Sequence, residues 1–441
     1  MKKAILTIAM LALTGVTFAQ KSENDRMLDR FLSYVHIGSQ SVDTTDGIFF
    51  LTDGQRQMST LIYNEIKAIK GVEVKMSPDY YVYAQVPSNM EKKVPSVAFM
   101  AHLDNTPEAP GPNIGRQVHP IVHHNYNGGE IVLNNDIVLS PNSPQGAHLK
   151  ELIGKTIVTS DGTTLLGADC KAGCAILITL IEKLATEKEF KHGDVYFFFT
   201  TNEEVGEVAM RMDLGYLNKV PEILIDVDGN DYGEFSVANF TAENRTYLFK
   251  GNQAHSSNGK VLGYADARTA MAYFIAQLPL DVHPSNSEGM QGYVHCFDVE
   301  EMDNMQDWKL KFRLRYFDKA DSVTYSGYMN EAMRKTRAAF PKVEIVMTDS
   351  FIQYDNIANS MYPGLPDIII AAAEKTGMPM KPTNLRAGTT CALLVAKGLP
   401  GGPCIYGGQQ AVHSVSEWCC IEELVDLTRL CHEIISQLTI L

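Results

Sequence analysis

The sequence predicts an α/β protein in which a mostly parallel sheet, flanked by helices on both faces, is interrupted by an inserted α+β domain. Two observations support this fold class. Short runs that are apolar throughout alternate with helical patterns, and such runs are typical of strands buried on both faces of a parallel sheet. Between them, the middle of the chain follows the strand-helix-strand-strand-helix-strand order of ferredoxin-like domains.

The larger domain contains four predicted strands, of which the last is the weakest. They lie at residues 97–101, 195–200, 222–226 and 403–406. A predicted helix at residues 172–184 is apolar nearly all round, which indicates that protein covers it on every side. A second helix, at residues 368–375, has Asp367 as its expected N-cap and Gly377 as its stop.

The inserted domain is distinguished by its mixed pattern. Residues 310–315 alternate between apolar and basic side chains, which predicts a strand with one buried and one solvated face. We therefore divide the chain into residues 20–243, an insertion at residues 244–354, and residues 355–441. The expected elements of the insertion are strand 246–250, helix 266–277, strands 292–297 and 308–316, helix 326–339 and strand 343–347.

The composition excludes several classes of protein. The 441 residues include 38 Lys and Arg against 52 Asp and Glu, and the net charge of −14 argues against a nucleic-acid partner. Hydrophobic residues make up 45% of the chain, which is enough for a sizeable core. Most of the eight cysteines lie within apolar runs, so we expect buried thiols, although the sequence leaves their oxidation state open.

Residues 1–19 have the pattern of a secretory signal. Lys2 and Lys3 precede an apolar run at residues 4–13, and small residues follow up to Ala19. The run is too short to span a bilayer, so a membrane anchor is the less favoured alternative. We therefore expect a secreted or periplasmic protein with no membrane contact after cleavage of the signal.

Acidic and imidazole side chains follow the predicted strands or precede a helix. In open α/β sheets, ligands bind at the carboxyl ends of the strands, so we expect these side chains to converge. Imidazoles and carboxylates suit a borderline divalent cation such as Zn²⁺. Taken singly, each has a structural alternative, such as a hydrogen-bonded His, a solvated acid pair or an Asp-Gly turn. The residues are His102, Asp104, Asp169, Glu203, Glu204, Asp228 and His413.

Several motifs together resemble the dinuclear zinc exopeptidases, in particular their tripeptide aminopeptidase branch. This family is related to aminoacylases and glutamate carboxypeptidases, and the similarity runs from about residue 25 to the C-terminus. The resemblance implies a zinc-exopeptidase-like catalytic domain, with the insertion as its lid. The motifs are His102-Leu103-Asp104, residues 164–173 (TLLGADCKAG), residues 201–206 (TNEEVG), Asn239-Phe240 and residues 251–255 (GNQAH).

The resemblance also implies two metal ions that share a ligand. His102, Asp169 and Asp228 would bind one ion. Asp169, Glu204 and His413 would bind the other, so that Asp169 would bridge the pair. The expected cofactors are two zinc ions per chain, with cobalt or manganese as alternatives.

Two further acids of the cluster receive catalytic roles from the resemblance. Asp104 would orient the imidazole of His102, as carboxylates do for metal-bound histidines. Glu203 would be the general base that takes a proton from the attacking water. The expected partner is a short peptide substrate.

The lid supplies the remaining candidates. By resemblance His255 would reach the substrate carbonyl, in its own chain or across a possible homodimer. Arg315 and Arg386 would suit a peptide carboxylate, although solvated surface arginines are the alternative. Two positions depart from the family: Cys170 and Thr390 replace acids, and the second change affects recognition of the peptide and of its free amine.

These observations lead to a first hypothesis, an exopeptidase that removes the N-terminal residue from short peptides, above all tripeptides. A related amidohydrolase, either a carboxypeptidase or an N-acyl amino acid deacylase, is the second. A non-catalytic exported protein that binds peptides is the third, and the retained ligands and Glu203 argue against it.

Overall fold

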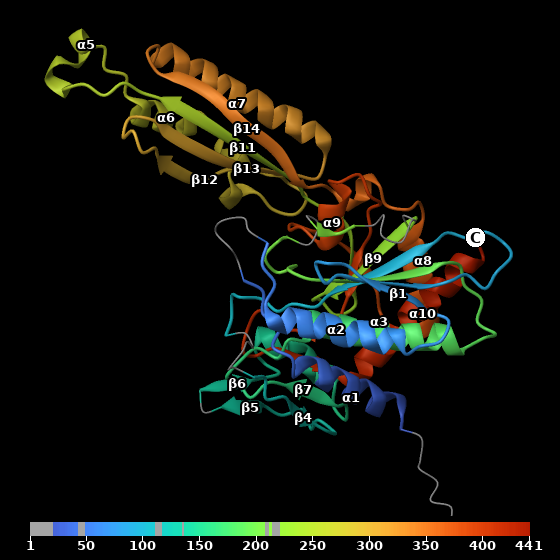
Figure 1. Cartoon of the computed structure of the whole chain (residues 1–441). Helices are drawn as coiled ribbons and strands as arrows, with labels where there is room; N and C mark the ends of the chain where they lie inside the picture. The colour runs from blue at the N-terminus through green and yellow to red at the C-terminus, as the bar shows by residue number, and fades with distance from the viewer. Residues whose placement is uncertain (1–20, 43–48, 111–116, 135, 208–210, 214–220) are drawn as a thin grey trace, which may run out of the picture.

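The computed structural model describes residues 21–42, 49–110, 117–134, 136–207, 211–213 and 221–441. The predicted signal at residues 1–19 lies outside these ranges. The described part contains one eight-stranded sheet, two four-stranded sheets and one two-stranded sheet, arranged as Figure 1 shows.

The central sheet has a parallel core. Strand β3 pairs in parallel with β8 and β9, and β9 pairs in parallel with β16, whereas β2 joins β8 antiparallel. Strands β3, β8, β9 and β16 are the four predicted from apolar runs, and the predicted fold class is confirmed. In spatial order the described strands are β1 (Glu73–Met76), β2 (Val82–Val86), β8 (Val195–Thr200), β3 (Val97–His102), β9 (Ile223–Gly229), β16 (Cys404–Tyr406), β10 (Glu234–Asn239) and β15 (Lys381–Leu385).

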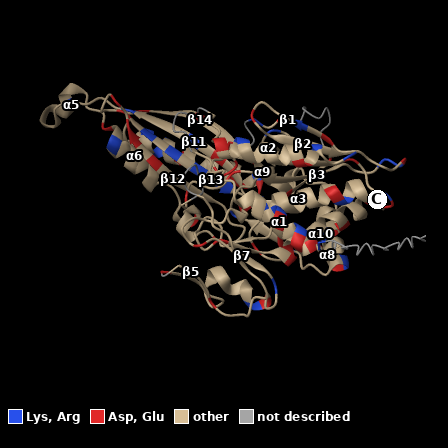
Figure 2. Cartoon of the chain, turned by 60° about the horizontal axis from the view of Figure 1, so that its bottom comes forward, with Lys and Arg blue, Asp and Glu red and all other residues tan. Residues whose placement is uncertain are grey.

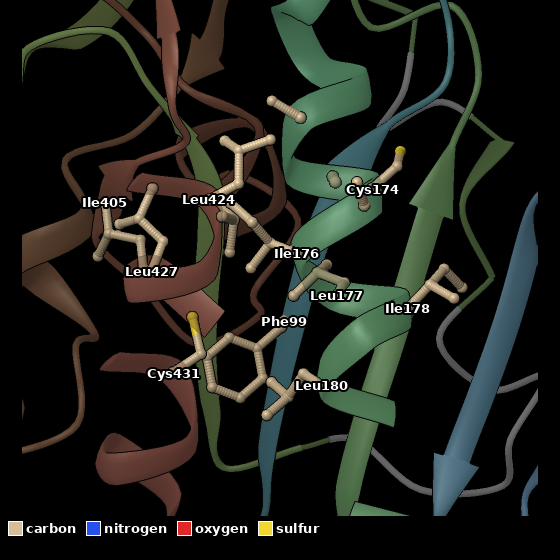
Figure 3. Close-up of a cluster of buried hydrophobic side chains, with 14 of the residues drawn as sticks. Phe99, Cys174, Ile176, Leu177, Ile178, Leu180, Ile405, Leu424, Leu427 and Cys431 are labelled. Atoms are coloured by element: carbon tan, nitrogen blue, oxygen red, sulfur yellow. The ribbon is translucent and has the colours of Figure 1, made fainter. Parts of the chain in front are cut away.

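Helices pack on both faces of this sheet because successive side chains of its strands point to opposite sides. Phe99 of β3 packs with Ile176, Leu180 and Cys431 on the face covered by α3 and α10 (Figure 3). On the opposite face the described apolar cluster includes Met100 and side chains of α9. The helices of the larger domain are α1 (Glu23–Val35), α2 (Asp53–Lys67), α3 (Ala168–Thr186), α8 (Leu365–Thr376), α9 (Thr390–Val395) and α10 (Ile421–Thr439).

One helix start agrees with its predicted position and one differs. Helix α3 spans Ala168–Thr186, but Asp169 and Cys170 have non-helical backbone angles, so its regular part begins close to the predicted residue 172. The prediction of Asp367 as the N-cap of α8 is wrong: Gly364, at φ 78°, caps the helix and Asp367 lies in the first turn. An acid there is favoured by the helix dipole, so sequence alone does not separate the two positions. The predicted stop at Gly377 is confirmed, with φ 73°.

The insertion has the predicted ferredoxin-like order. Its four strands pair antiparallel, and α6 (Ala267–Ala276) and α7 (Lys319–Ala339) pack on one face through a separate apolar core. The short helix α5 (Gly259–Leu262) lies at the end of this domain that is far from the central sheet (Figure 1). The strands, in spatial order, are β12 (Tyr293–Glu301), β13 (Trp308–Tyr316), β11 (Thr241–Lys250) and β14 (Glu344–Tyr354).

Strand β13 shows the predicted two-sided character. Leu310, Phe312 and Leu314 are buried in the core of the insertion. The basic residues between them lie on the other face, where Lys311 forms an ion pair of 2.8 Å with Asp298 of β12. Figure 2 shows Lys and Arg along these strands.

Two small sheets lie beside the central one, and sequence patterns did not predict them. Their strands are too short to show a period, yet they carry the loop from β17 to β18 that contains His413. The larger has the order β17 (Gln409–Gln410), β18 (Trp418–Cys420), β7 (Ile157–Thr159) and β4 (Ile121–His123), and the smaller pairs β5 (Ile131–Asn134) with β6 (Ile137–Leu139). A 3-10 helix, η1 (Pro144–Glu151), completes this region.

The cysteines are thiols in this fold. All eight are free, and all but Cys296 are buried, as expected for small apolar side chains. Within the described ranges, no helix combines the length and apolar character needed to cross a membrane.

Candidate metal centre

The carboxyl ends of the central strands bring the predicted ligands together. His102 is the last residue of β3, Asp228 is near the end of β9, and Glu204 follows β8. Asp169 enters from the first turn of α3, and His413 from the loop between β17 and β18. Gly173 permits the close approach of α3 to β9, because a Cβ there would lie 2.4 Å from the carbonyl oxygen of Val227.

The side chains form two groups that share Asp169. In the first, Nε2 of His102 lies 2.9 Å from Oδ1 of Asp169 and 3.5 Å from Oδ1 of Asp228. In the second, Nε2 of His413 lies 2.9 Å from Oε2 of Glu204 and 3.5 Å from Oδ2 of Asp169. Each oxygen of Asp169 therefore contacts a different imidazole.

These donors fit divalent cations. One atom each from His102, Asp169 and Glu204 lie within 4.8 Å of one another, a spacing suited to one ion. Oε1 of Glu204 is buried and has no hydrogen-bond partner in the described structure, so it is available to a ligand. Nitrogen and carboxylate oxygen donors suit Zn²⁺ and its neighbours in the first transition series.

The raised pKa values of Glu203 and Glu204 reflect the close packing of buried acids in the cluster. Burial raises the pKa of Glu203 to about 8, and the charges of Asp228 and Asp104 add to the effect. Burial likewise raises the pKa of Glu204 to about 7, although a hydrogen bond with His413 opposes it. Such a concentration of acids is costly unless cations compensate it.

The pKa values of His413 and Asp169 shift so that the charged form of each group is favoured, whereas those of Glu203 and Glu204 shift toward the neutral form. Hydrogen bonds to Asp169 and Glu204 raise the pKa of His413 to about 11. Burial disfavours ionised Asp169, but hydrogen bonds with both imidazoles outweigh it and hold its pKa below the usual range. In the metal-free protein, protonated imidazoles thus supply the positive charge that bound cations would otherwise supply to the acids.

Asp104 is buried and contacts three other residues of the cluster. Its Oδ1 accepts a hydrogen bond of 3.1 Å from the backbone N–H of Glu203, and its Oδ2 accepts one of 3.2 Å from Glu204. Nδ1 of His102 lies 3.1 Å from the backbone oxygen of Asp104 and 3.5 Å from its carboxylate. Asp104 was predicted to orient His102; in the structure its carboxylate also holds the backbone of Glu203 and Glu204.

Glu203 borders a cavity beside the two groups. Its Oε1 accepts a hydrogen bond of 3.0 Å from the hydroxyl of Thr390, the first residue of α9. The cavity has a volume of about 250 Å³, and Gly388 and Thr389 line it together with the ligand side chains.

Sequence patterns missed several residues that support the ligands. The carboxylate of Glu417 is buried and accepts hydrogen bonds of 2.6 and 2.8 Å from the backbone N–H groups of Gly167 and Asp169. Gln409 donates a hydrogen bond of 3.0 Å to Oδ1 of Asp228. The only signal in the sequence is the position of Glu417, four residues after His413, which is too weak to interpret alone.

The three predicted substrate-binding residues do not join this cluster in the described structure. His255 is exposed and contacts Ser257 of its own loop. Arg315 is buried and donates to three acceptors on β11 and β13, including the Leu314 carbonyl at 3.0 Å. The guanidinium of Arg386 donates to the carbonyls of Gly289 and Gln291 and to both oxygens of Ser287, which joins the two domains.

Comparisons with known proteins agree with the motifs. The model of peptidase family M20/M25/M40 matches residues 165–437. Peptidase T of Listeria monocytogenes is 32% identical over 416 residues, which cover 93% of this chain and 98% of that protein.

Solved structures share the fold. The aminopeptidase PepT of Bacillus cereus has a TM-score of 0.70 at 19% identity and covers 94% of this chain and 99% of its own. A dinuclear metal-binding M20 peptidase from Bacillus subtilis has a TM-score of 0.62 at 14% identity and covers 95% and 98%.

The predicted location is wrong. We expected a secreted or periplasmic protein from residues 1–19, whereas the peptidase T relatives that match nearly the whole chain are cytoplasmic enzymes. A basic start followed by an apolar run is a short compositional pattern, so it carries less weight than similarity along 93% of the chain.

The resemblance proposed from the motifs is confirmed, as is the prediction of an enzyme that acts on peptides. The chain belongs to peptidase family M20/M25/M40.

Proposed function

We propose that this peptidase is a dinuclear zinc aminopeptidase that removes the N-terminal residue from short peptides, above all tripeptides. The observation that carries the proposal is the shared position of Asp169 between the His102 and His413 groups. A carboxylate with one oxygen directed to each imidazole suits two neighbouring cations. Similarity to peptidase T along the chain supports the choice of substrate.

The ligands divide into two sets. His102 and Asp228 would hold one ion, Glu204 and His413 would hold the other, and Asp169 would contact both. When bound, such ions supply Lewis acidity that polarises the scissile carbonyl and makes water a stronger acid. Zinc suits the mixed imidazole and carboxylate donors, and cobalt or manganese would suit them as well.

Glu203 moves the proton. Its carboxylate takes a proton from the water that attacks the peptide carbonyl and then delivers it to the leaving amine. In the metal-free site burial raises the pKa of Glu203 to about 8. Cations bound beside it would lower this pKa, so the carboxylate would be ionised and able to accept the proton. The hydroxyl of Thr390 holds Oε1 at 3.0 Å, which leaves Oε2 for the proton.

The lid would close over the peptide. The cavity of about 250 Å³ accommodates a small part of a tripeptide, so the rest would lie between the domains. We propose that closure of residues 244–354 brings His255 and Arg315 toward the substrate and excludes water. Arg386 would then exchange its contacts with the loop at residues 287–291 for the peptide carboxylate, and a homodimer is an alternative source of His255.

The test combines metal loading with a substrate series. The protein loaded with zinc is incubated with free and N-acetylated di-, tri- and tetrapeptides, and the products are identified by mass. We expect release of the N-terminal residue from free tripeptides. Glu203→Gln should retain both ions and lose turnover by about 10²–10⁴-fold, because the amide cannot accept the proton. Retention of less than one ion by the unmodified protein would contradict the proposal.

One observation favours a second candidate, an N-acyl amino acid deacylase. Thr390 offers a neutral hydroxyl beside Glu203, where an acid would attract the charged amine of a free peptide. Faster cleavage of the N-acetylated series than of the free series would support this candidate over the aminopeptidase.

A further inference from the structure

A thiol lies next to one of the two cation positions. The Sγ of Cys170 and one ligand atom each from His102 and Asp228 all lie within 4.8 Å of one another. Cys170 has no exposed surface. Together these atoms offer a nitrogen, an oxygen and a sulfur donor on the His102 side of the centre.

The packing fixes the sulfur at this place. The thiol donates a hydrogen bond of 3.2 Å to the carbonyl oxygen of Val227, the residue before Asp228. Gly173 makes room for the sulfur against α3, because a Cβ on this residue would lie only 2.7 Å from Sγ. The hydrogen bond to Val227 and this gap together place the sulfur near Asp228 and His102.

We propose that Cys170 contributes a sulfur ligand to the cation held by His102 and Asp228, and that this position prefers thiophilic ions such as Cd²⁺ and Zn²⁺ over Mn²⁺. The inference rests on the proposed function, which supplies the cation. As the bond from sulfur to metal forms, the thiol loses its proton to the solvent. Soft donors favour these ions, whereas the nitrogen and oxygen donors around His413 do not discriminate in the same way.

The experiment uses Co²⁺ as a spectroscopic probe. The full-length protein is stripped with a chelator, loaded with Co²⁺, and dialysed, after which bound cobalt is measured and the absorption spectrum recorded. We expect visible d–d bands together with an ultraviolet charge-transfer band from sulfur to cobalt. Competition between Cd²⁺ and Mn²⁺ gives the preference of the site.

Two serine variants provide the comparison. Cys170→Ser keeps a hydrogen-bond donor for the Val227 carbonyl but removes the sulfur, so the charge-transfer band should disappear. The preference for Cd²⁺ over Mn²⁺ should fall by about tenfold or more, a common size for changes around a metal ligand. Cys174→Ser is the matched control, because this buried thiol donates to the backbone oxygen of His102 at 3.2 Å and should leave the band unchanged.

The outcomes separate this inference from the proposed function. Cobalt retention with d–d bands but without the sulfur band, or a band that persists in Cys170→Ser, would overturn the sulfur ligand alone. No retained cobalt in the unmodified protein would overturn the metal centre and with it the proposed function. Circular dichroism of each variant confirms that its fold is intact before the spectra are compared.

Discussion

The two imidazoles of the centre are held in different ways. His102 ends a central strand, and 2% of its side chain is exposed. His413 lies in a loop at φ 55°, and 35% of its side chain is exposed. Nδ1 of His102 faces the buried Asp104. Nδ1 of His413 instead lies 2.9 Å from the carboxylate of Glu108, whose side chain is 73% exposed.

In the proposed dinuclear centre, this difference predicts one firmly held cation beside His102 and one readily exchanged cation beside His413. A ligand fixed by a strand and buried partners loses little entropy when it binds a cation, whereas a ligand on an exposed loop must be ordered first. We therefore expect the ion beside His102 to dissociate more slowly than the ion beside His413. The predictions below test this comparison.

The largest effect should follow a change that removes both positions. Asp169→Asn keeps the volume of the side chain but removes its charge and one of the two oxygens that contact the imidazoles. We expect less than about one bound ion per chain by metal analysis after dialysis, and no detectable turnover. Asp367→Asn, an exposed change in α8, is the control and should affect neither measurement. Two retained ions in Asp169→Asn would show that the positions are independent.

A pair of variants distinguishes the two positions directly. His413→Ala should leave the ion at the His102 position in place, whereas His102→Ala should weaken retention of that ion by about 10–100-fold or more. Competition with a chromophoric chelator measures both affinities. Equal losses in the two variants would remove the distinction between a firm and an exchangeable position.

A smaller effect is expected at Glu203, the proposed general base. Thr390→Val removes the hydrogen bond to Oε1 of Glu203. A hydrogen bond to a charged group contributes about 1.5–3 kcal/mol, so kcat should fall by at least about tenfold. Thr390→Ser should restore it, and neither variant should alter metal content. A change confined to KM would assign Thr390 to substrate binding instead.

The firm position was the more predictable one. His102 and Asp228 follow strands whose apolar runs are visible in the sequence, so their convergence follows from the ends of a parallel sheet. The surroundings of His413 depend on strands of two or three residues that show no period. The position of the loop became clear only from the fold, as did the backbone contacts of Glu417.

The proposed substrate-binding arginines show a different limit. Arg315 and Arg386 have the chemistry of carboxylate binders, but their guanidinium groups donate to backbone carbonyls in the described structure. Carbonyl acceptors are present in every residue, so sequence cannot indicate which arginine they will engage. The same holds for Cys170, whose place beside His102 and Asp228 depends on the approach of α3 to β9.

The smallest effect concerns pH and the exposed imidazole. In the chelator-treated protein, hydrogen bonds to Asp169 and Glu204 raise the pKa of His413 from 6.5 to about 11. A raised pKa means that the folded state binds the proton more tightly, so the stabilisation is complete below about pH 6.5 and declines as the pH rises toward 11. Glu204, whose pKa rises from 4.5 to about 7 through burial, has a shift of the same sign but titrates at lower pH.

Burial raises the pKa of Glu203 and of Glu417 to about 8, so these acids share the decline up to about that pH. Urea unfolding of the unmodified protein and of a His413 variant at several pH values therefore isolates the contribution of His413. His413→Gln should flatten the dependence, because glutamine has no proton to lose in this range. The effect is modest, since the side chain is 35% exposed and solvent screens the interaction. Saturating Zn²⁺ should reverse the trend, because binding requires a neutral imidazole and strengthens as protons leave. An identical pH dependence in His413→Gln and the unmodified protein would assign the stabilisation to the buried His102 side instead.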